Sequence, residues 1–379
     1  MTPARRALAW LALVVAATLA GCSGTPKPKP TPLEPLTPQI GGRLVWSARV
    51  NKVEFPLQIA VNQTASSGAT FTVAASDGTL LALQADSGRE LWRMNIGAPL
   101  AAGVGSDGRF SAVVTRDNEL VVVEAGRIAW RARMGARVAT APLVAGERVF
   151  VMGVDRVVTA FDAQDGRRLW VLRRPSDPLT LSQAGVLAAF KDTLLAGQGP
   201  KLAGVDPLQG TLRWEVAVAT PRGANEVERL SDLLAPIARV GNVVCARAFQ
   251  NAVGCVNAER GTIVWTRKVG GNQGIAGDAQ IVVGADGSDR VTAWHMTSGE
   301  VAWTNERLLY RELSAPLLVG RTAIFGDIEG VVHFLAREDG RPLLRLTTDG
   351  SAITTAPALS ERTVLVVTSS GGLFAFRPE

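Results

Sequence analysis

The sequence predicts an all-β chain, folded as an eight-bladed β-propeller of four-stranded antiparallel blades. The main observation is a tryptophan that returns behind a glycine turn at an average spacing of about 43 residues, the length of one four-stranded blade. The recurring residues are Trp46, Trp92, Trp130, Trp170, Trp214, Trp265 and Trp303. An eighth copy of the pattern, at residues 339–344, has Leu344 where the tryptophan would stand.

Each period repeats the signals of short strands. β-branched runs such as 148–152 and 363–367 are separated by turns, and six Asp-Gly pairs supply the left-handed residues that tight hairpins need. Five Ala-Pro pairs open periods, and proline suits the first residue of a strand because no ladder donor is lost there. No helical pattern of useful length follows residue 40. These signals predict strands throughout residues 41–379.

The two ends of the repeat array predict how the ring closes. The first copy, residues 42–46, is an outer strand with no earlier strands before it, whereas the last copy, residues 363–376, stops before its outer strand. Pairing the N-terminal strand with the C-terminal blade completes eight blades. The same pairing removes two edges that could otherwise bind strands of other chains.

The repeated tryptophans are interpreted as structural wedges between neighbouring blades, where a large flat ring buries much apolar area. The alternative is an aromatic ligand box. It would require all seven rings to face one cavity, and equivalent positions around a ring of blades do not converge in this way.

A secretion signal precedes the repeats. Arg5 and Arg6 come before an apolar run of 14 residues, 7–20, which is too short to span a bilayer and is typical of a signal peptide. The run ends in Leu19-Ala20-Gly21-Cys22, which resembles the bacterial lipobox, in which the cysteine is acylated and becomes the first residue of the mature protein. In lipoproteins of enteric bacteria an aspartate after this cysteine favours the inner membrane. Ser23 therefore points to the outer membrane, with the chain lipid-anchored at Cys22 on the periplasmic side.

The predicted domains are a signal peptide at 1–21, the lipidated cysteine with a Pro-rich tether at 22–40, and the propeller at 41–379. The tether contains six prolines and two lysines between residues 25 and 39. Such a segment is expected to be extended and semi-rigid, with a reach of about 60 Å.

The charge balance argues against nucleic acid as a partner. The whole chain has a formal charge of +6, and removal of 1–21 takes away Arg5 and Arg6, which leaves +4. The densest basic stretch, residues 127–137, has four arginines that alternate with apolar residues. We expect this stretch on an outer strand, where charge protects an exposed edge. Contact with anionic headgroups is the alternative.

Catalytic and metal-binding signals are weak. The chain has two histidines, His295 and His333, neither with ligand spacing, and one tyrosine, so general acid-base chemistry has few candidate groups. No cofactor is expected apart from the lipid on Cys22. Cys245 and Cys255 lie on what we expect to be consecutive strands of one blade. They can form a cross-strand disulfide if the intervening turn has three residues, whereas another register would place them out of opposition, and the sequence leaves both open.

Two families share this repeat. The Gly-x-x-x-Trp pattern resembles that of the pyrroloquinoline-quinone dehydrogenase propellers, but those enzymes have an adjacent Cys-Cys pair, a calcium site and a longer chain. The lipobox, the Pro-rich tether and eight blades with little decoration are more similar to the BamB family, the lipoprotein subunits of the β-barrel assembly machinery. The most specific resemblance is in residues 228–233 and 178–182.

The BamB resemblance implies a non-enzymatic scaffold whose two loops dock on the periplasmic POTRA domains of BamA and assist the insertion of outer-membrane proteins, with nascent barrel strands as a further partner. The family's Leu-x-Leu-Arg pattern has serine at its arginine position, and Arg-Leu-Ser-Asp-x-Asp has leucine at its second aspartate, so this contact is expected to be more apolar. The expected partner-binding residues are Leu179, Leu181, Ser182, Arg229, Leu230, Asp232, Leu233 and Leu234.

The composition of these loops supports the same interpretation. Four of the leucines, Leu179, Leu181, Leu233 and Leu234, are assigned to connections rather than strands, and apolar groups exposed on a rigid ring indicate a partner site. The alternative is that they fold back on their own blades. Two other functions remain open: a quinoprotein dehydrogenase, and a lipoprotein that binds peptidoglycan or another glycan.

Overall fold

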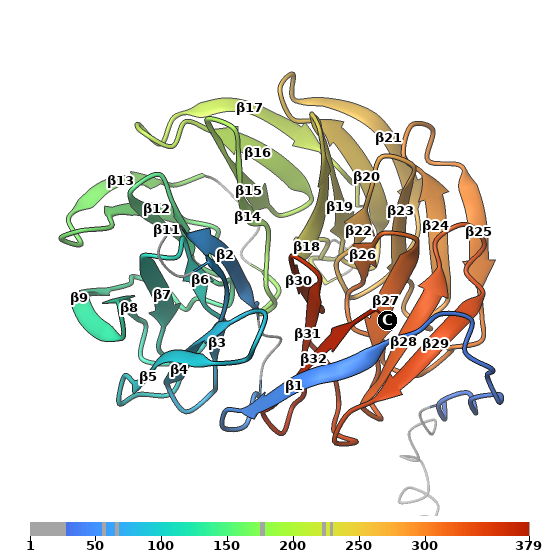
Figure 1. Cartoon of the computed structure of the whole chain (residues 1–379). Coiled ribbons are helices and arrows are strands. Elements are labelled where there is room, and N and C mark those ends of the chain that lie inside the picture. Colours follow the sequence, from blue (N-terminus) through green and yellow to red (C-terminus); the bar gives the residue numbers. More distant parts are fainter. Residues whose placement is uncertain are drawn as a thin grey trace, which may run out of the picture. The chain divides into compact units, whose positions relative to one another are not determined.

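The computed structural model describes residues 28–54, 58–64, 68–174, 179–221, 225–227 and 230–378, and in this part of the chain all regular structure is β (Figure 1). Eight antiparallel sheets of four strands each form the blades of a propeller. The predicted fold class is therefore confirmed. Among the described residues, no helix is long and apolar enough to cross a membrane.

The first half of the chain forms four blades, each ordered from its innermost to its outermost strand. Blade 1 has β2 (Ala60–Thr64), β3 (Gly68–Ala74), β4 (Thr79–Gln84) and β5 (Glu90–Asn95). Blade 2 has β6 (Gly105–Ser106), β7 (Phe110–Val114), β8 (Glu119–Glu124) and β9 (Arg127–Arg133). Blade 3 has β10 (Leu143–Ala145), β11 (Arg148–Met152), β12 (Val158–Asp162) and β13 (Arg168–Leu172). Blade 4 has β14 (Leu187–Phe190), β15 (Thr193–Gln198), β16 (Lys201–Val205) and β17 (Leu212–Ala217).

The second half of the chain repeats the arrangement. Blade 5 has β18 (Leu233–Val240), β19 (Val243–Ala248), β20 (Ala252–Asn257) and β21 (Thr262–Lys268). Blade 6 has β22 (Ala276–Gly277), β23 (Ile281–Ala285), β24 (Val291–His295) and β25 (Val301–Asn305). Blade 7 has β26 (Leu317–Val319), β27 (Thr322–Gly326), β28 (Val331–Ala336) and β29 (Pro342–Thr347). Blade 8 has β30 (Ala358–Ser360), β31 (Thr363–Val367), β32 (Gly372–Arg377) and, as its outer strand, β1 (Arg43–Arg49).

The ring closes as the sequence predicts. β1 pairs with β32 in antiparallel register from Arg43 opposite Arg377 to Arg49 opposite Gly372, so strands from the two ends of the chain complete one blade (Figure 1). The first strands of consecutive blades contact one another at seven of the eight junctions, including β30 of blade 8 with β2 of blade 1, and at the junction of blades 4 and 5 the contact is between β15 and β18.

Each repeated tryptophan packs against a glycine of the following blade. The ring of Trp170 on β13, for example, covers Gly210 in the turn between β16 and β17, where a Cβ atom would lie 2.5 Å from the ring. Gly210 has a φ of +72°, so both its conformation and the space require glycine. The other pairs are Trp46 with Gly88, Trp92 with Gly126, Trp130 with Gly166, Trp214 with Gly261, Trp265 with Gly299 and Trp303 with Gly340.

The eighth junction uses leucine in place of tryptophan. Leu344 on β29 packs against Gly42, just before β1, with 2.7 Å between its Cδ2 atom and a Cβ added at that glycine. Five of the tryptophans also fix the neighbouring blade through the indole N–H, which donates to a backbone carbonyl. These donors are Trp46, Trp130, Trp170, Trp265 and Trp303. The glycine-tryptophan repeat is thus the joint between blades.

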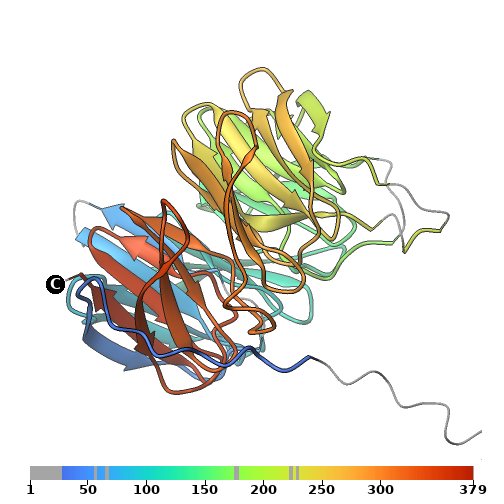
Figure 2. The same cartoon turned by 90° about the vertical axis from the view of Figure 1, so that its right-hand side faces the viewer.

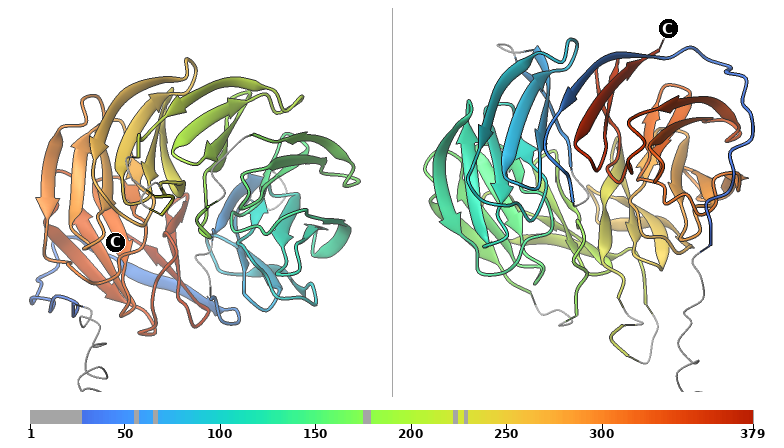
Figure 3. Two further views of the ribbon diagram at one scale, coloured as in Figure 1. Left: turned by 180° about the vertical axis from the view of Figure 1, so that it is seen from behind. Right: turned by 90° about the horizontal axis from the view of Figure 1, so that it is seen from below.

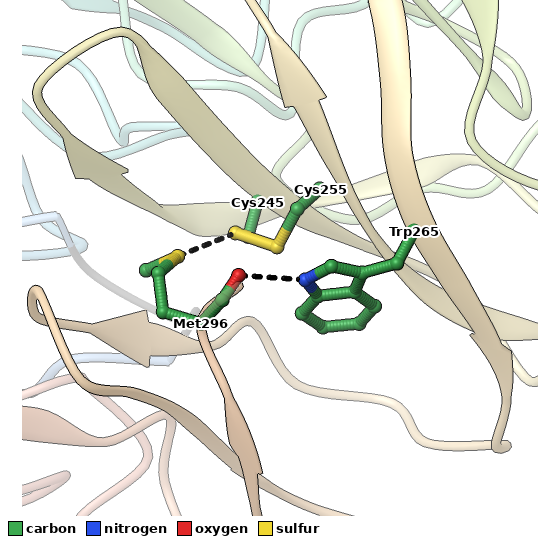
Figure 4. The surroundings of a disulfide bond; sticks show 4 residues. All are labelled: Cys245, Cys255, Trp265 and Met296. Carbon is green, nitrogen blue, oxygen red and sulfur yellow. Dashed lines mark hydrogen bonds between the residues drawn. A yellow bond between two sulfur atoms is a disulfide. The ribbon is translucent and has the colours of Figure 1, made fainter. Parts of the chain in front are cut away.

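A disulfide joins the middle strands of blade 5 (Figure 4). The turn between β19 and β20 has three residues, 249–251, and this register places Cys245 directly opposite Cys255. Both cysteines are fully buried, and the sulfur of Cys245 lies 3.7 Å from that of Met296 in blade 6. The indole of Trp265 donates to the carbonyl of the same methionine.

The two faces of the ring are built differently. One face, which we call the connection face, carries the connections between blades together with the turns between second and third strands. Backbone hydrogen bonds join these two sets, as from Phe249 N–H to the Asp232 carbonyl and from Ile328 N–H to the Arg311 carbonyl. The opposite face carries the remaining turns, including the glycine turns that receive the tryptophans.

The N-terminal segment differs from its predicted form. Residues 31–40, which the sequence assigns to a free tether, form one compact unit with the propeller. They run along the outer strand of blade 7, where the blue trace passes beside the orange and red strands before entering β1 (Figures 2 and 3). We call this segment the strap. Its contacts with blade 7 shorten the tether that we expected to reach about 60 Å.

Candidate docking site

The two loops singled out by the sequence meet on the connection face. Leu179–Ser182 belongs to the connection between blades 3 and 4, and Leu230–Asp232 to the connection between blades 4 and 5. A hydrogen bond of 3.0 Å from the Leu181 N–H to the Asp232 Oδ2 atom joins them directly. We call residues 179–182 and 230–232 the docking loops.

An internal ion pair holds this junction. The guanidinium of Arg156, in the turn between β11 and β12, lies 2.7 Å from the Asp232 Oδ1 atom, and both side chains are largely buried. The Arg156 Nε–H also donates to the same oxygen at 2.9 Å, and the Arg156 carbonyl accepts from the Gln198 side chain at 3.1 Å. One carboxylate thus connects parts of blades 3, 4 and 5.

This pairing changes the role expected for Asp232. The sequence places it in the contact with a partner, but both of its oxygens are used within the chain. Asp232 positions the docking loops and does not present a free charge. Sequence reasoning missed Arg156, because it lies 76 residues away in another blade and no local pattern marks it.

The leucines divide into exposed and buried sets. Leu179 is 37% exposed, Ser182 is exposed, and Leu181 and Leu230 are half-buried. Leu233 and Leu234 are only 1% and 2% exposed, so the expectation that they lie exposed in a connection is wrong. The face that the docking loops present is therefore smaller than the sequence predicts.

The reason for this error is a proline inside a strand. The other Ala-Pro pairs precede or border a first strand, but Ala235-Pro236 lies within β18, which begins at Leu233. A register shift between Leu234 and Ala238 accommodates the proline. Leu233 packs into the core between blades 4 and 5, and Leu234 pairs with the buried Arg247. Arg229 and Cys22 lie outside the described residues.

Among the described residues, the docking loops border a hollow that is smaller than a ligand site. The hollow beside them, lined by Met152, Arg156, Leu181, Asp232 and other residues, has a volume of about 30 Å³. This is room for roughly one water molecule. The arrangement suits contact with another macromolecule rather than binding of a small molecule.

Removing the charge of Asp232 tests the positioning role. Asp232→Asn should lower the free energy of unfolding by about 1–3 kcal/mol, because Arg156 is left largely buried without its carboxylate. Amide hydrogen exchange should quicken at Leu181, whose N–H loses a charged acceptor. Asp165→Asn, at an exposed turn, is the matched control and should change stability by less than about 0.5 kcal/mol. Equal effects of the two substitutions would contradict the positioning role.

The histidines and carboxylates do not form a metal site in the described part of the chain, where no group of three or more potential ligands occurs. His333 in blade 7 is buried with its Nε2 atom 2.8 Å from the Asp327 Oδ2 atom, while His295 is exposed in blade 6. Burial lowers the pKa of His333, which favours a neutral ring. Burial opposes ionisation of Asp327, but hydrogen bonds from His333, Val331 and Arg311 outweigh it and lower the pKa of this carboxyl.

Three of the four arginines of the basic stretch, Arg127, Arg131 and Arg133, lie on the outer strand β9, as the sequence predicts, whereas Arg137 lies in the connection that follows. Arg131 pairs with Glu119 on the neighbouring strand and also donates to the Ile96 carbonyl of blade 1. The protective role of these charges at the exposed edge stays a prediction.

Comparisons with known proteins bear on the family. A family model described as outer membrane protein assembly factor BamB matches residues 76–305. The outer membrane protein assembly factor BamB of Burkholderia pseudomallei is 36% identical over 364 residues, which cover 95% of this chain and 94% of the relative.

Solved structures show the fold. The crystal structure of BamB from Moraxella catarrhalis matches with a TM-score of 0.78 at 22% identity, over 89% of this chain and 99% of that one. The quinohemoprotein alcohol dehydrogenase from Comamonas testosteroni matches with a TM-score of 0.66 at 14% identity, over 89% of this chain and 76% of the enzyme. Both likenesses concern the propeller itself.

Proposed function

The chain belongs to the family of outer membrane protein assembly factor BamB, and from this premise we propose that it is a non-enzymatic scaffold of the outer-membrane β-barrel assembly machinery. In this role the docking loops bind the periplasmic POTRA domains of BamA, and the complex assists the insertion of outer-membrane proteins. Acylation at Cys22 anchors the propeller to the periplasmic side of the outer membrane. No cofactor is required beyond this lipid.

The observation that supports docking best is the rigid support of an exposed apolar residue. Leu179 is exposed, while Leu181 donates its N–H to Asp232, which is paired with Arg156. A partner that covers Leu179 and Leu181 gains apolar burial at a lower ordering cost, since these contacts already fix the backbone at Leu181. Exposed leucine in a connection on a rigid scaffold is typical of a binding site.

The chemistry of this contact departs from the resemblance. Ser182 stands at the position of the family's arginine, and Leu234, at the position of its second aspartate, is buried in β18. Asp232 is already paired with Arg156. We therefore propose a contact centred on Leu179 and Leu181 with hydrogen bonds from Ser182, in which charge pairing contributes little.

One observation favours a scaffold over the enzyme alternative: Cys245 and Cys255 are used in a structural disulfide inside blade 5. The cavity lined by Gly103, Ala184 and Pro236 has a volume of about 320 Å³, so ligand binding there has to be tested directly. A quinoprotein should show a raised melting temperature with added quinone and calcium, whereas the proposed scaffold should not respond. Peptidoglycan fragments should likewise leave the melting temperature unchanged.

Leu179→Asp tests the docking surface. Calorimetry between the folded propeller and the BamA periplasmic domains should show a loss of affinity of at least about tenfold, because an unpaired carboxylate would be buried at the interface. Folding should survive, since Leu179 is exposed.

Leu208→Asp is the matched control. Leu208 is 62% exposed in the turn between β16 and β17, on the opposite face, and its replacement should leave the affinity unchanged. Undiminished binding by a well-folded Leu179→Asp variant would remove the docking loops from the proposal. Equal loss in both variants would point to a nonspecific effect of added charge.

A further inference from the structure

The strap begins at a fixed point on the connection face. The Thr31 N–H donates to the Leu309 carbonyl at 3.0 Å, and the Thr31 carbonyl accepts from the Arg311 Nη1 atom at 2.9 Å. Both partners lie in the connection between blades 6 and 7. That connection is joined to turns of the same face, since the Tyr310 N–H donates to the Ser288 carbonyl.

Arg311 is a strong anchor because it is held on its other sides. Its side chain is only 2% exposed, and its Nε–H donates to the buried Asp327 carboxylate at 2.7 Å. It also forms an ion pair with Glu329. These contacts fix the Arg311 guanidinium independently of the strap. The hydrogen bond from Arg311 to the Thr31 carbonyl therefore costs less side-chain entropy.

From this point the strap runs antiparallel to β29 toward the opposite face. The Glu34 carbonyl accepts from Arg345 of β29, and the Gln39 N–H donates to the Leu343 carbonyl at 2.8 Å. Leu33 packs against the core between blades 6 and 7, and Ile40 against the core between blades 7 and 8. The strap then leads into β1, as the blue trace in Figure 3 shows.

We infer that the propeller is held with its connection face, and hence the docking loops, turned toward the membrane that anchors Cys22. This inference rests on the proposed lipid anchor and docking function. Eight residues, 23–30, separate Cys22 from Thr31, and the nine steps from one to the other can span at most about 30 Å. The opposite face is farther from Thr31 by the length of a blade strand, roughly 20 Å.

The consequence concerns the partner. A span of at most about 30 Å between the membrane and Thr31 on the connection face is no more than the diameter of one small domain. A protein bound at the docking loops would therefore lie between the propeller and the membrane, so the structure fits a partner whose bound domain is itself close to the bilayer.

Fluorescence resonance energy transfer from a labelled cysteine of the propeller to an acceptor in the membrane tests the orientation. Asn272→Cys on the connection face and Thr297→Cys on the opposite face place one exposed thiol at each end of blade 6. The native Cys245 and Cys255 are already joined. The lipidated full chain, labelled at either thiol, is incorporated into vesicles of phosphatidylethanolamine and phosphatidylglycerol that contain a headgroup-labelled acceptor.

We expect at least about twofold more efficient transfer from position 272 than from position 297. Equal efficiencies, or the reverse order, would overturn the inference. Replacing residues 31–39 by an equally long Gly-Ser segment should abolish the difference, because the anchor at Thr31 is lost. A difference that persists in this variant would show that the strap does not orient the propeller.

Two controls separate this inference from the function on which it rests. Cys22→Ala should not associate with the vesicles, and a Cys22→Ala chain that still floats with them would refute the lipid anchor. The measurement uses no partner protein. A failure of Leu179→Asp to weaken partner binding would therefore leave the orientation result standing.

Discussion

Trp170→Ala is expected to lower the free energy of unfolding by about 3–5 kcal/mol, the usual cost of deleting a large packed aromatic side chain. The ring joins blades 3 and 4. It covers Gly210, lies 5.8 Å from the Phe150 ring, and donates through Nε1 to the Pro207 carbonyl at 3.0 Å. Alanine at this position would leave the space above Gly210 empty.

Urea unfolding followed by circular dichroism measures this loss. The matched control is Val171→Ala, the next residue of β13, which is 37% exposed and should cost less than about 1 kcal/mol. Equal midpoints for the parent and the Trp170 variant would mean that the ring contributes no packing energy. The role of the whole glycine-tryptophan repeat would then have to be reconsidered, because the seven tryptophans occupy equivalent positions.

The fold could be predicted because the contacts between neighbouring blades depend on a short local pattern, a glycine turn followed by a tryptophan. At seven of the eight junctions an indole ring of one blade covers a glycine of the next blade, and only glycine fits beneath that ring. The turn and the tryptophan therefore recur together at a fixed spacing. Ring closure followed from the same pattern, since residues 42–46 form a complete outer strand without the three strands that should precede it.

The candidate site was predicted less well because its stability comes from residues far apart in the sequence. The docking loops were found by composition, but the pairing of Asp232 with Arg156 joins blade 3 to blade 5 and leaves no local signal. Leu233 and Leu234 were misplaced because Pro236 suggests the start of a strand, while a register shift lets β18 begin three residues earlier. Composition can mark a loop, but it does not determine which of its side chains remain exposed.

The contacts of the strap could not be predicted from composition either. A Pro-rich segment is extended whether it is free or bound, so composition predicted its conformation and not its contacts. Those contacts depend on Arg311 and Arg345, roughly 280 and 310 residues further along the chain. Of the tether expected at residues 22–40, residues 31–40 therefore pack on the propeller.

Asp327→Ala is the second substitution expected to have a large effect, about 3–5 kcal/mol of unfolding free energy, because it breaks a buried ion pair by removing one partner. Asp327 is fully buried. One oxygen accepts from Arg311 and His333, and the other accepts from the N–H groups of Glu329 and Val331. Its loss leaves the Arg311 guanidinium buried and the turn between β27 and β28 without its acceptor.

Glu329→Ala provides the comparison, since Glu329 pairs with the same guanidinium but is 57% exposed. Solvent already screens this pair, so its loss should cost less than about 1 kcal/mol. Urea unfolding of both variants measures the loss in free energy of unfolding. Comparing the two losses shows whether burial of the carboxylate, and not the pairing alone, makes the larger contribution. If the two losses in unfolding free energy are equal, the buried Asp327 contributes no more to stability than the exposed Glu329. If the Asp327 loss is several times larger, the carboxylate is the centre that fixes Arg311, and with it the first residue of the strap.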